Sequence, residues 1–336
     1  MRKPLHHSTV AGSLIACILA TAGVLAAVAY GQGSAAPRPD LQGIWTSSTL
    51  TPLERPAGME GKPVLTGPEA VQLAKFILQQ QDRDRRDGGE GADVVRGYNE
   101  LFFDRGNALA RIGGTIPTSL IFDPPNGQIP PLTAAAVARV AAQRAETSEH
   151  PADSPRNRSL PERCLLAAST GPPMVPGLYN NYYQIVQTPD YVMILSEMMH
   201  DVRIVPLDAL NPALKPRPHP PPAVRLWLGD SVGHWDGQTL VVDTTNFTAK
   251  TSFHGSDANL HLIERFTRVA PAMIVYEFTV DDPTAFTRSW SARLPLVSSD
   301  GPIYEYACHE GNYALRDILA GAREEERKAE PPARPR

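Results

Sequence analysis

Strand-like apolar segments separated by turn residues fill the chain between residues 184 and 307, and this pattern constrains the fold most. Asp236 and Gly237 separate two such segments, and Asp-Gly between strands is the strongest short signal for a β-hairpin. Pro189-Asp190 and Ala270-Pro271-Ala272 separate two further pairs. We expect about nine strands, at 184–188, 191–197, 202–207, 224–235, 238–247, 260–269, 273–281, 287–296 and 303–307.

Helices do not alternate with these strands, so a doubly wound parallel sheet is not expected. The sequence favours a mainly β fold in which an antiparallel meander forms a barrel of lipocalin or calycin type, with a sandwich as the other antiparallel arrangement. The lipocalin comparison rests on Gly43 and Trp45 near the start, on the hairpins and on a closing helix expected at 312–328. It is an analogy of fold alone.

Two helices are expected before the strand region. Thr66 is a helix N-cap with Glu69 in the first turn, and Thr133 caps a second helix at 134–145. The 33 prolines gather mainly outside the hairpins, which indicates long ordered excursions around the strands. The expected parts are a signal peptide at 1–36, a helical and proline-rich segment packed on the barrel at 37–160, the β-barrel domain at 161–311, and a C-terminal helix with a disordered tail at 312–336.

The first residues predict secretion. Arg2 and Lys3 precede an apolar stretch at 10–30, and small residues that suit cleavage follow it, as in a secretory signal peptide. An uncleaved membrane anchor is the alternative, and a lipoprotein attached through Cys17 is a minor one. Cleavage leaves 30 basic against 36 acidic residues and no basic patch, so nucleic acid is not an expected partner. We expect a secreted or periplasmic protein without a membrane partner once the signal is removed.

Two cysteines follow the signal segment, Cys164 and Cys308. In an oxidising compartment an isolated pair of this kind predicts a disulfide, and two buried thiols are the alternative. A nucleophilic cysteine is less expected than either, and no Gly-x-Ser-x-Gly motif is present.

Strand parity places one carboxylate on an apolar face. In the segment 260–269, Glu264 alternates with leucines and Phe266, and a three-residue loop at 270–272 would pair Phe266 with Tyr276 and Glu264 with Phe278. An unpaired buried carboxylate is costly, so Glu264 requires a partner or a raised pKa. It is either an acid that faces a ligand or half of a structural ion pair, with Arg203 or Arg293.

Acid–base chemistry has further candidates at two places. His200 and Asp201 precede a strand, and His with a neighbouring carboxylate is the usual composition of a general base. His309 follows Cys308, where a disulfide would hold it in place. If the protein is an enzyme, the catalytic candidates are His200, Asp201, Glu264, Tyr276 and His309. Loop residues and structural ion pairs are the alternative for each of them.

Planar amides and phenols in the segment 179–184 suit hydrogen bonding and stacking against a sugar or an aromatic ligand. The ligand-binding candidates are Asn180, Tyr182, Gln184, Arg203, Trp227, Trp235, Phe266, Phe278 and Glu310. His254, His261 and Glu264 are not expected to bind a metal, because His261 and Glu264 have opposite strand parity. No cofactor is expected, since no glycine-rich phosphate loop is present.

Long motifs in this chain resemble those of a large group of uncharacterised, signal-peptide-bearing bacterial proteins. They are WLGDS-x-G-x-W-x-G-x-TLVVDTTNF at 227–247, ERFT at 264–267, YEFTV at 276–280 and YEYACHEGNY at 304–313. The resemblance spans most of residues 40–325. It implies a secreted or periplasmic protein, but it does not indicate an enzymatic activity. His234 and His254 stand where arginine is usual in the group, which weakens any catalytic role for these two.

From these features we expect a secreted or periplasmic β-barrel protein that binds a small, partly apolar ligand in the mouth of its barrel. One alternative is a cofactor-free lyase, isomerase or hydrolase in the same pocket, with Arg203 stabilising an anion. Another is a structural or interaction protein of the cell envelope. Whether the protein is an enzyme stays open at this point.

Overall fold

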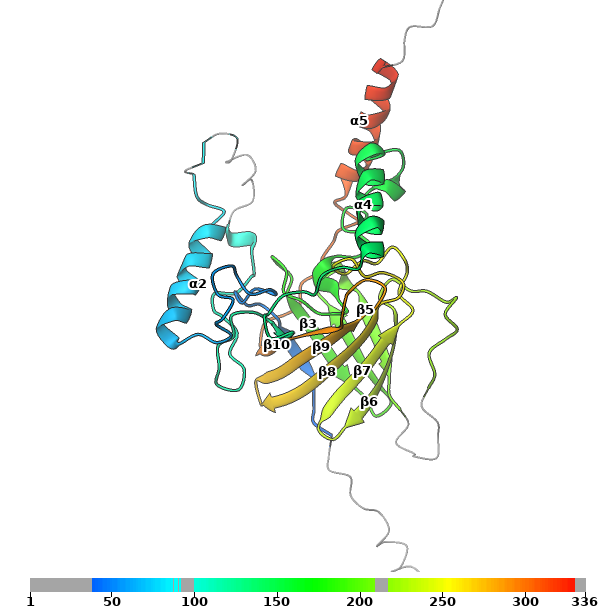
Figure 1. Ribbon diagram of the computed structural model, residues 1–336. Coiled ribbons are helices and arrows are strands. Elements are labelled where there is room, and N and C mark those ends of the chain that lie inside the picture. Colours follow the sequence, from blue (N-terminus) through cyan, green and yellow to red (C-terminus); the bar gives the residue numbers. More distant parts are fainter. Residues whose placement is uncertain (1–37, 87, 90, 92–99, 209–216, 330–336) are drawn as a thin grey trace, which may run out of the picture. The chain divides into compact units, whose positions relative to one another are not determined.

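One ten-stranded antiparallel sheet dominates the computed structural model (Figure 1), which describes residues 38–86, 88–89, 91, 100–208 and 217–329. The expected signal peptide at 1–36, with Cys17, and the tail at 330–336 lie outside the described residues. The strand order is β5-β4-β3-β1-β10-β9-β8-β7-β6, and β2 also pairs with β10. The strands are β1 (Gly43–Thr46), β2 (Ile121–Asp123), β3 (Tyr182–Gln187), β4 (Tyr191–Ser196), β5 (Val202–Pro206), β6 (Asp230–Asp236), β7 (Thr239–Thr245), β8 (His261–Ala270), β9 (Met273–Asp281) and β10 (Trp290–Ser299).

The mainly β, antiparallel prediction is confirmed, but the sheet is not closed by a continuous ladder. Near the terminal strands β5 and β6, a bridge joins Leu207, which follows β5, to Gly233 of β6, and the Asp208 N–H donates to the Gly233 carbonyl at 2.8 Å. A Cβ atom at Gly233 would lie 2.9 Å from the side chains of both Leu207 and Val205. The approach of the two edges therefore requires glycine there.

The chain does not form one simple meander. Strands β3 to β5 and β6 to β10 are two separate meanders, and β1 joins them by pairing with both β3 and β10. The strand predicted at 303–307 is wrong, because these residues form an irregular segment that ends at Cys308 and contacts loops instead of a neighbouring strand. The strand predicted from 224 begins only at Asp230.

The predicted register of the β8–β9 hairpin is confirmed. Phe266 lies opposite Tyr276 and Glu264 opposite Phe278. The turn differs in detail, since Ala270 already pairs with Met273 and an irregularity between Arg268 and Ala270 shifts the register. This bulge adds one extra residue to β8, and the extra residue keeps the apolar side chains of β8 and β9 on the same face of the sheet.

That face forms the main core, which is filled with large side chains. Trp45, Tyr183, Phe266, Tyr276 and Trp290 are each at most 1% exposed. Their rings pack closely, with 4.9 Å between the ring centroids of Phe266 and Tyr276. Burial of each such ring stabilises the fold by about 1.5–3 kcal/mol.

In the part of the chain that the structure describes, the α-helices are α2 (Gly67–Gln81), α4 (Ala134–Glu149) and α5 (Tyr313–Ala329), which lie outside the sheet. Thr66 and Glu69 form the expected capping box of α2, and Thr133 caps α4 by accepting a hydrogen bond from Ala136. Helix α4 is four residues longer than expected. Short 3₁₀ turns occur at η1 (Glu100–Phe102), η2 (Pro155–Asn157), η3 (Ala168–Thr170) and η4 (Met198–His200). Within the described ranges, no helix has the length and apolar character needed to cross a membrane.

Candidate functional site

A cavity of about 770 Å³ lies at the end of the β3–β4 hairpin. Tyr182 is the first residue of β3 and Glu197 directly follows β4. The neighbouring Tyr183 is buried in the core, so the alternation of side chains places Tyr182 on the opposite face of the sheet. We call this cavity the aromatic pocket; its lining residues are Arg83, Phe102, Phe103, Asp104, Leu178, Tyr179, Asn180, Tyr182, Glu197, Tyr304 and Tyr306.

Rings from three separate segments form the wall of the aromatic pocket. The Tyr179 and Tyr306 rings stack at 6.4 Å between centroids, and Phe103 meets Tyr179 edge-on at 6.5 Å. The guanidinium groups of Arg105 and Arg83 lie 4.6 and 5.5 Å from the centroid of Phe103. The wall therefore offers flat apolar faces with a negative π-surface.

Glu197 is a buried carboxylate of this pocket, with only 2% of its surface exposed. Its Oε1 accepts a hydrogen bond from the Tyr304 N–H at 3.0 Å, and the Asn180 side chain also hydrogen-bonds to it. Burial nevertheless raises the pKa of Glu197, and the negative charge of Asp104 adds to the effect.

Asp104 is the second carboxylate. Its main-chain carbonyl accepts hydrogen bonds from Ser48 Oγ and Asn181 Nδ2, which fixes the position of the residue. Its Oδ2 is buried and has no hydrogen-bond partner. Burial raises the pKa of Asp104. Among the described residues, no lysine, arginine or histidine forms an ion pair with Asp104 or Glu197.

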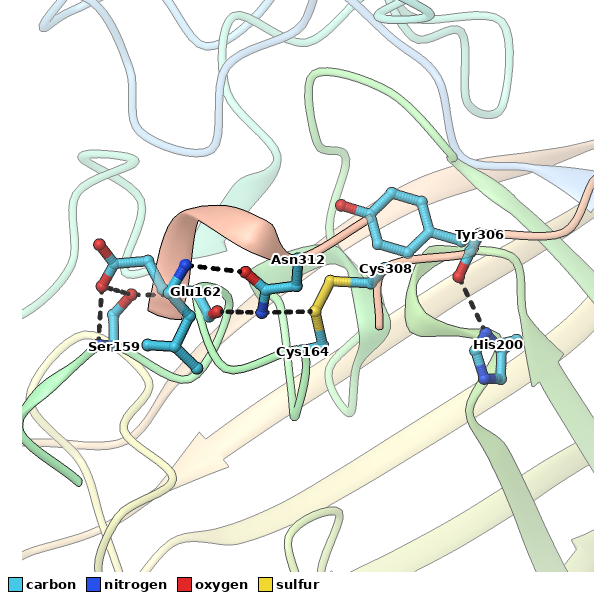
Figure 2. The surroundings of a disulfide bond; sticks show 8 residues. Ser159, Glu162, Cys164, His200, Tyr306, Cys308 and Asn312 are labelled. Carbon is cyan, nitrogen blue, oxygen red and sulfur yellow. Dashed lines mark hydrogen bonds between the residues drawn. A yellow bond between two sulfur atoms is a disulfide. The ribbon is translucent and has the colours of Figure 1, made fainter. Parts of the chain in front are cut away.

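A disulfide holds one wall of the aromatic pocket, and Figure 2 shows its surroundings. Cys164 and Cys308 are bonded with their Cα atoms 5.7 Å apart, which suits the predicted pairing. His200 Nδ1 lies 3.1 Å from the Tyr306 carbonyl oxygen, and Asn312 Nδ2 donates to the Glu162 carbonyl at 2.8 Å. These contacts fix the segment 304–308, which carries Tyr304 and Tyr306.

The backbone around the pocket is unusual. Asn180, Met199, His200 and Cys164 have φ angles of 54°, 62°, 45° and 54°, in the left-handed region that non-glycine residues rarely adopt. Met198 and Met199 are buried against the disulfide and Tyr306. Backbone strain of this kind persists only where surrounding contacts enforce it.

Of the residues predicted to bind a ligand, Asn180 and Tyr182 line the aromatic pocket. Gln184 lies further along β3, and Trp227 and Trp235 lie before and within β6. Phe266 and Phe278 are buried in the core, and Glu310 is exposed in the turn before α5. Only two of the nine therefore line the aromatic pocket.

The predicted acid–base residues are likewise dispersed. Glu264, Tyr276 and Arg203 form a buried network in the core: Arg203 binds Glu264 through both terminal nitrogens, and the Tyr276 hydroxyl donates to Glu264 Oε1 at 2.8 Å. The Met174 N–H donates to the Tyr276 oxygen at 3.0 Å. Of the two partners considered for Glu264, the structure selects Arg203, while Arg293 lies 4.0 Å from Glu277.

His200 and His309 lie nearer the disulfide. Both are exposed; His200 contacts the Tyr306 carbonyl, and His309 lies in the turn that follows Cys308. Burial raises the pKa of Asp201 beside His200. None of these three residues lines the aromatic pocket.

Among the pocket residues that the sequence analysis missed are Phe103, Asp104, Glu197, Tyr304 and Tyr306. A weak signal exists for two of them, because Asp104 directly follows a Phe-Phe pair and Glu197 directly follows an apolar strand. Tyr304 and Tyr306 were assigned to a strand that the structure does not contain.

A second group of titratable side chains lies on the sheet near β6 and β7. His219 contacts Asp230 at 2.7 Å and Asp243 at 3.1 Å, and His261 contacts the other oxygen of Asp243 at 3.0 Å. The hydrogen bond to Asp243 raises the pKa of His261. This cluster ties the segment before β6 to the sheet. Within the described residues, no group of three or more histidine, cysteine or acidic side chains has the arrangement of a metal site.

Comparisons of this chain with protein-family models, with curated proteins and with solved structures give no significant match.

Proposed function

We propose that this chain is a secreted or periplasmic protein that binds a small, partly apolar ligand in the aromatic pocket. The observation that carries the proposal is the cavity lined by Phe103, Tyr179, Tyr306 and Asp104, together with the Oδ2 atom of Asp104, which is buried and has no hydrogen-bond partner. A buried polar atom of this kind costs about 1–3 kcal/mol. A ligand that donates a hydrogen bond there would recover that free energy.

The dimensions and lining of the pocket support the same proposal. A volume of about 770 Å³ lies within the range of small-molecule sites, which combine apolar walls with a few polar groups. Tyr182 and Asn180 add a phenol and an amide beside the two carboxylates. The ligand therefore has a flat or apolar body and at least one hydrogen-bond donor.

We further propose that the sheet is a barrel of calycin type, whose core is filled by side chains and whose ligand binds at one end on the outer face. Contact of β5 and β6 at Leu207 and Gly233 supports this closure. The disulfide supports export, because such bonds persist in oxidising compartments.

An enzyme acting on the bound molecule is a second candidate function. Two carboxylates with raised pKa values in one cavity are the groups that general acid–base catalysis uses. In this candidate Glu197 and Asp104 take the role that the sequence analysis gave to Glu264 and Tyr276.

Native mass spectrometry of the purified protein tests the binding proposal. We expect co-purifying small molecules on the wild type and their loss from Leu178→Trp, in which a larger side chain enters the cavity. Tyr313→Ala, an exposed tyrosine of α5, is the matched control and should keep them. Molecules retained by Leu178→Trp, or absent from all three proteins, would contradict the proposal.

A further inference from the structure

The aromatic pocket contains two carboxylates, Asp104 and Glu197, that form no ion pair with a basic side chain of the described residues. Glu197 receives hydrogen bonds from an N–H and an amide, and Asp104 Oδ2 receives none. Neither carboxylate forms an ion pair among the described residues. Buried charges in proteins are otherwise paired, as Glu264 is with Arg203 in the core.

Arg83 is the basic residue that lines the pocket, and its guanidinium lies 5.5 Å from the centroid of Phe103. Arg105 lies over the same ring and binds both oxygens of Glu100 at 2.9 and 2.8 Å. These arginines show that a ring of this wall attracts cations. Neither Arg83 nor Arg105 forms an ion pair with Asp104 or Glu197.

A neutral ligand and a cationic ligand would satisfy this site differently. A sugar or an alcohol could donate a hydrogen bond to Asp104 Oδ2 but would leave both negative charges in a partly desolvated cavity. An ammonium group would donate the same hydrogen bond, neutralise charge and lie against the faces of Tyr179 and Tyr306. Cation–π contacts contribute about 0.5–2 kcal/mol, more where water is excluded.

Resting on the binding function proposed above, we propose that the aromatic pocket selects a small organic cation: an amine carried on an aromatic or apolar body. Its ammonium group lies between Asp104 and Glu197, and its body lies against Phe103, Tyr179 and Tyr306.

Three ligands of nearly equal size test this selectivity by isothermal titration calorimetry on the disulfide-bonded protein. Benzylamine is a cation at neutral pH, benzyl alcohol is neutral and benzoate is an anion. We expect benzylamine to bind at least about tenfold more tightly than benzyl alcohol, which corresponds to about 1.4 kcal/mol. Benzoate should bind most weakly of the three.

Variants show whether the pocket carboxylates cause the preference. Glu197→Gln should weaken benzylamine about tenfold and leave benzyl alcohol unchanged. Glu305→Gln removes the same charge from an exposed position of the neighbouring segment and should change neither affinity. Arg83→Gln removes a competing cation and should leave benzylamine at least as tightly bound. The thermal unfolding midpoint of each variant verifies that it is folded.

Three results would overturn the cation proposal while leaving the pocket as a binding site: equal affinity for benzylamine and benzyl alcohol, tightest binding of benzoate with its loss in Arg83→Gln, or no effect of Glu197→Gln. If none of the three ligands binds but Leu178→Trp still removes co-purified molecules, the preference for cations is again wrong and the binding function stands. If Leu178→Trp removes nothing, the binding function itself fails.

Discussion

Two groups of carboxylates in this protein have opposite surroundings. In the core, Glu264 has no exposed surface and is bound by Arg203 and Tyr276. In the aromatic pocket, Glu197 and Asp104 lie against phenols and a phenylalanine without an ion-pair partner. The first arrangement is complete in the protein alone, which is typical of a structural role. The second would be completed by the ligand that we propose for this pocket.

Breaking the core network should have the largest effect. Arg203→Met leaves the Glu264 charge buried without compensation, so we expect a loss of about 3–5 kcal/mol in the free energy of unfolding. Urea unfolding followed by tryptophan fluorescence measures it. Arg293→Met, on the outer face beside Glu277, is the control and should cost less than about 1 kcal/mol. Equal losses in the two variants would show that the Arg203–Glu264 pair is not specially needed.

Removing the disulfide should have the next largest effect. The double variant Cys164→Ser/Cys308→Ser opens a connection between residues 144 positions apart, and we expect a loss of about 2–5 kcal/mol. Hydrogen exchange should show faster opening at Tyr304, whose N–H binds Glu197 in the native protein. Unchanged protection there would mean that the disulfide does not hold the pocket wall. A reductant should destabilise the wild type and not the double variant.

Replacing Glu197 should slightly raise the free energy of unfolding, whereas the two preceding variants lower it. Burial raises the pKa of Glu197 above 4.5, so the stability linked to its protonated form is complete below the unfolded pKa and is lost as pH rises through the folded pKa. Glu197→Gln cannot ionise, so the variant does not lose this stability as the pH rises. We expect the variant to equal or exceed the wild type by up to about 1 kcal/mol at neutral pH and to match it below pH 4.5. A variant clearly less stable than the wild type at neutral pH would place Glu197 with Glu264 as a structural group.

The smallest effect is expected at the pair formed by His261 and Asp243, which is partly exposed. Asp243 raises the pKa of His261 above 6.5, so this pair contributes stability below pH 6.5 and loses it as pH rises through the folded pKa. His261 is 38% exposed, and solvent limits the gain to about 0.5 kcal/mol. His261→Gln should therefore destabilise the protein slightly at mildly acidic pH, where His261 is charged and Asp243 is still ionised, and not in alkali, as measured by thermal unfolding. A loss that grows with pH would contradict this sign.

Local pattern was sufficient to predict the hairpins and one important register. Alternation along 260–269 and 273–281 placed Phe266 opposite Tyr276 and put Glu264 on the apolar face, because side chains alternate strictly between the two faces of a strand. The caps at Thr66 and Thr133 were predicted for a similar reason, since they depend on residues three positions away.

Local pattern failed where contacts come from distant parts of the chain. Alternating tyrosines predicted a strand at 303–307, but the structure holds these residues through Cys164, Glu197 and His200, which are more than 100 positions earlier. Asp104 and Glu197 were missed because nothing adjacent to them shows that two other segments enclose them. The catalytic roles suggested for His200 and His309 stay predictions, and neither residue lines the pocket.

The sequence by itself determined that this chain forms antiparallel hairpins, that Glu264 faces the core and that Cys164 and Cys308 are a plausible pair. Periodicity and composition act over a few residues and are therefore visible in the linear order. Only the tertiary structure decided which carboxylates have partners. Arg203 comes to Glu264 from a position 61 residues away, while no basic residue comes within ion-pair distance of Asp104 or Glu197 in the described chain. A side chain's environment is set by the segments that fold around it, and that difference separates the closed core from the proposed binding site.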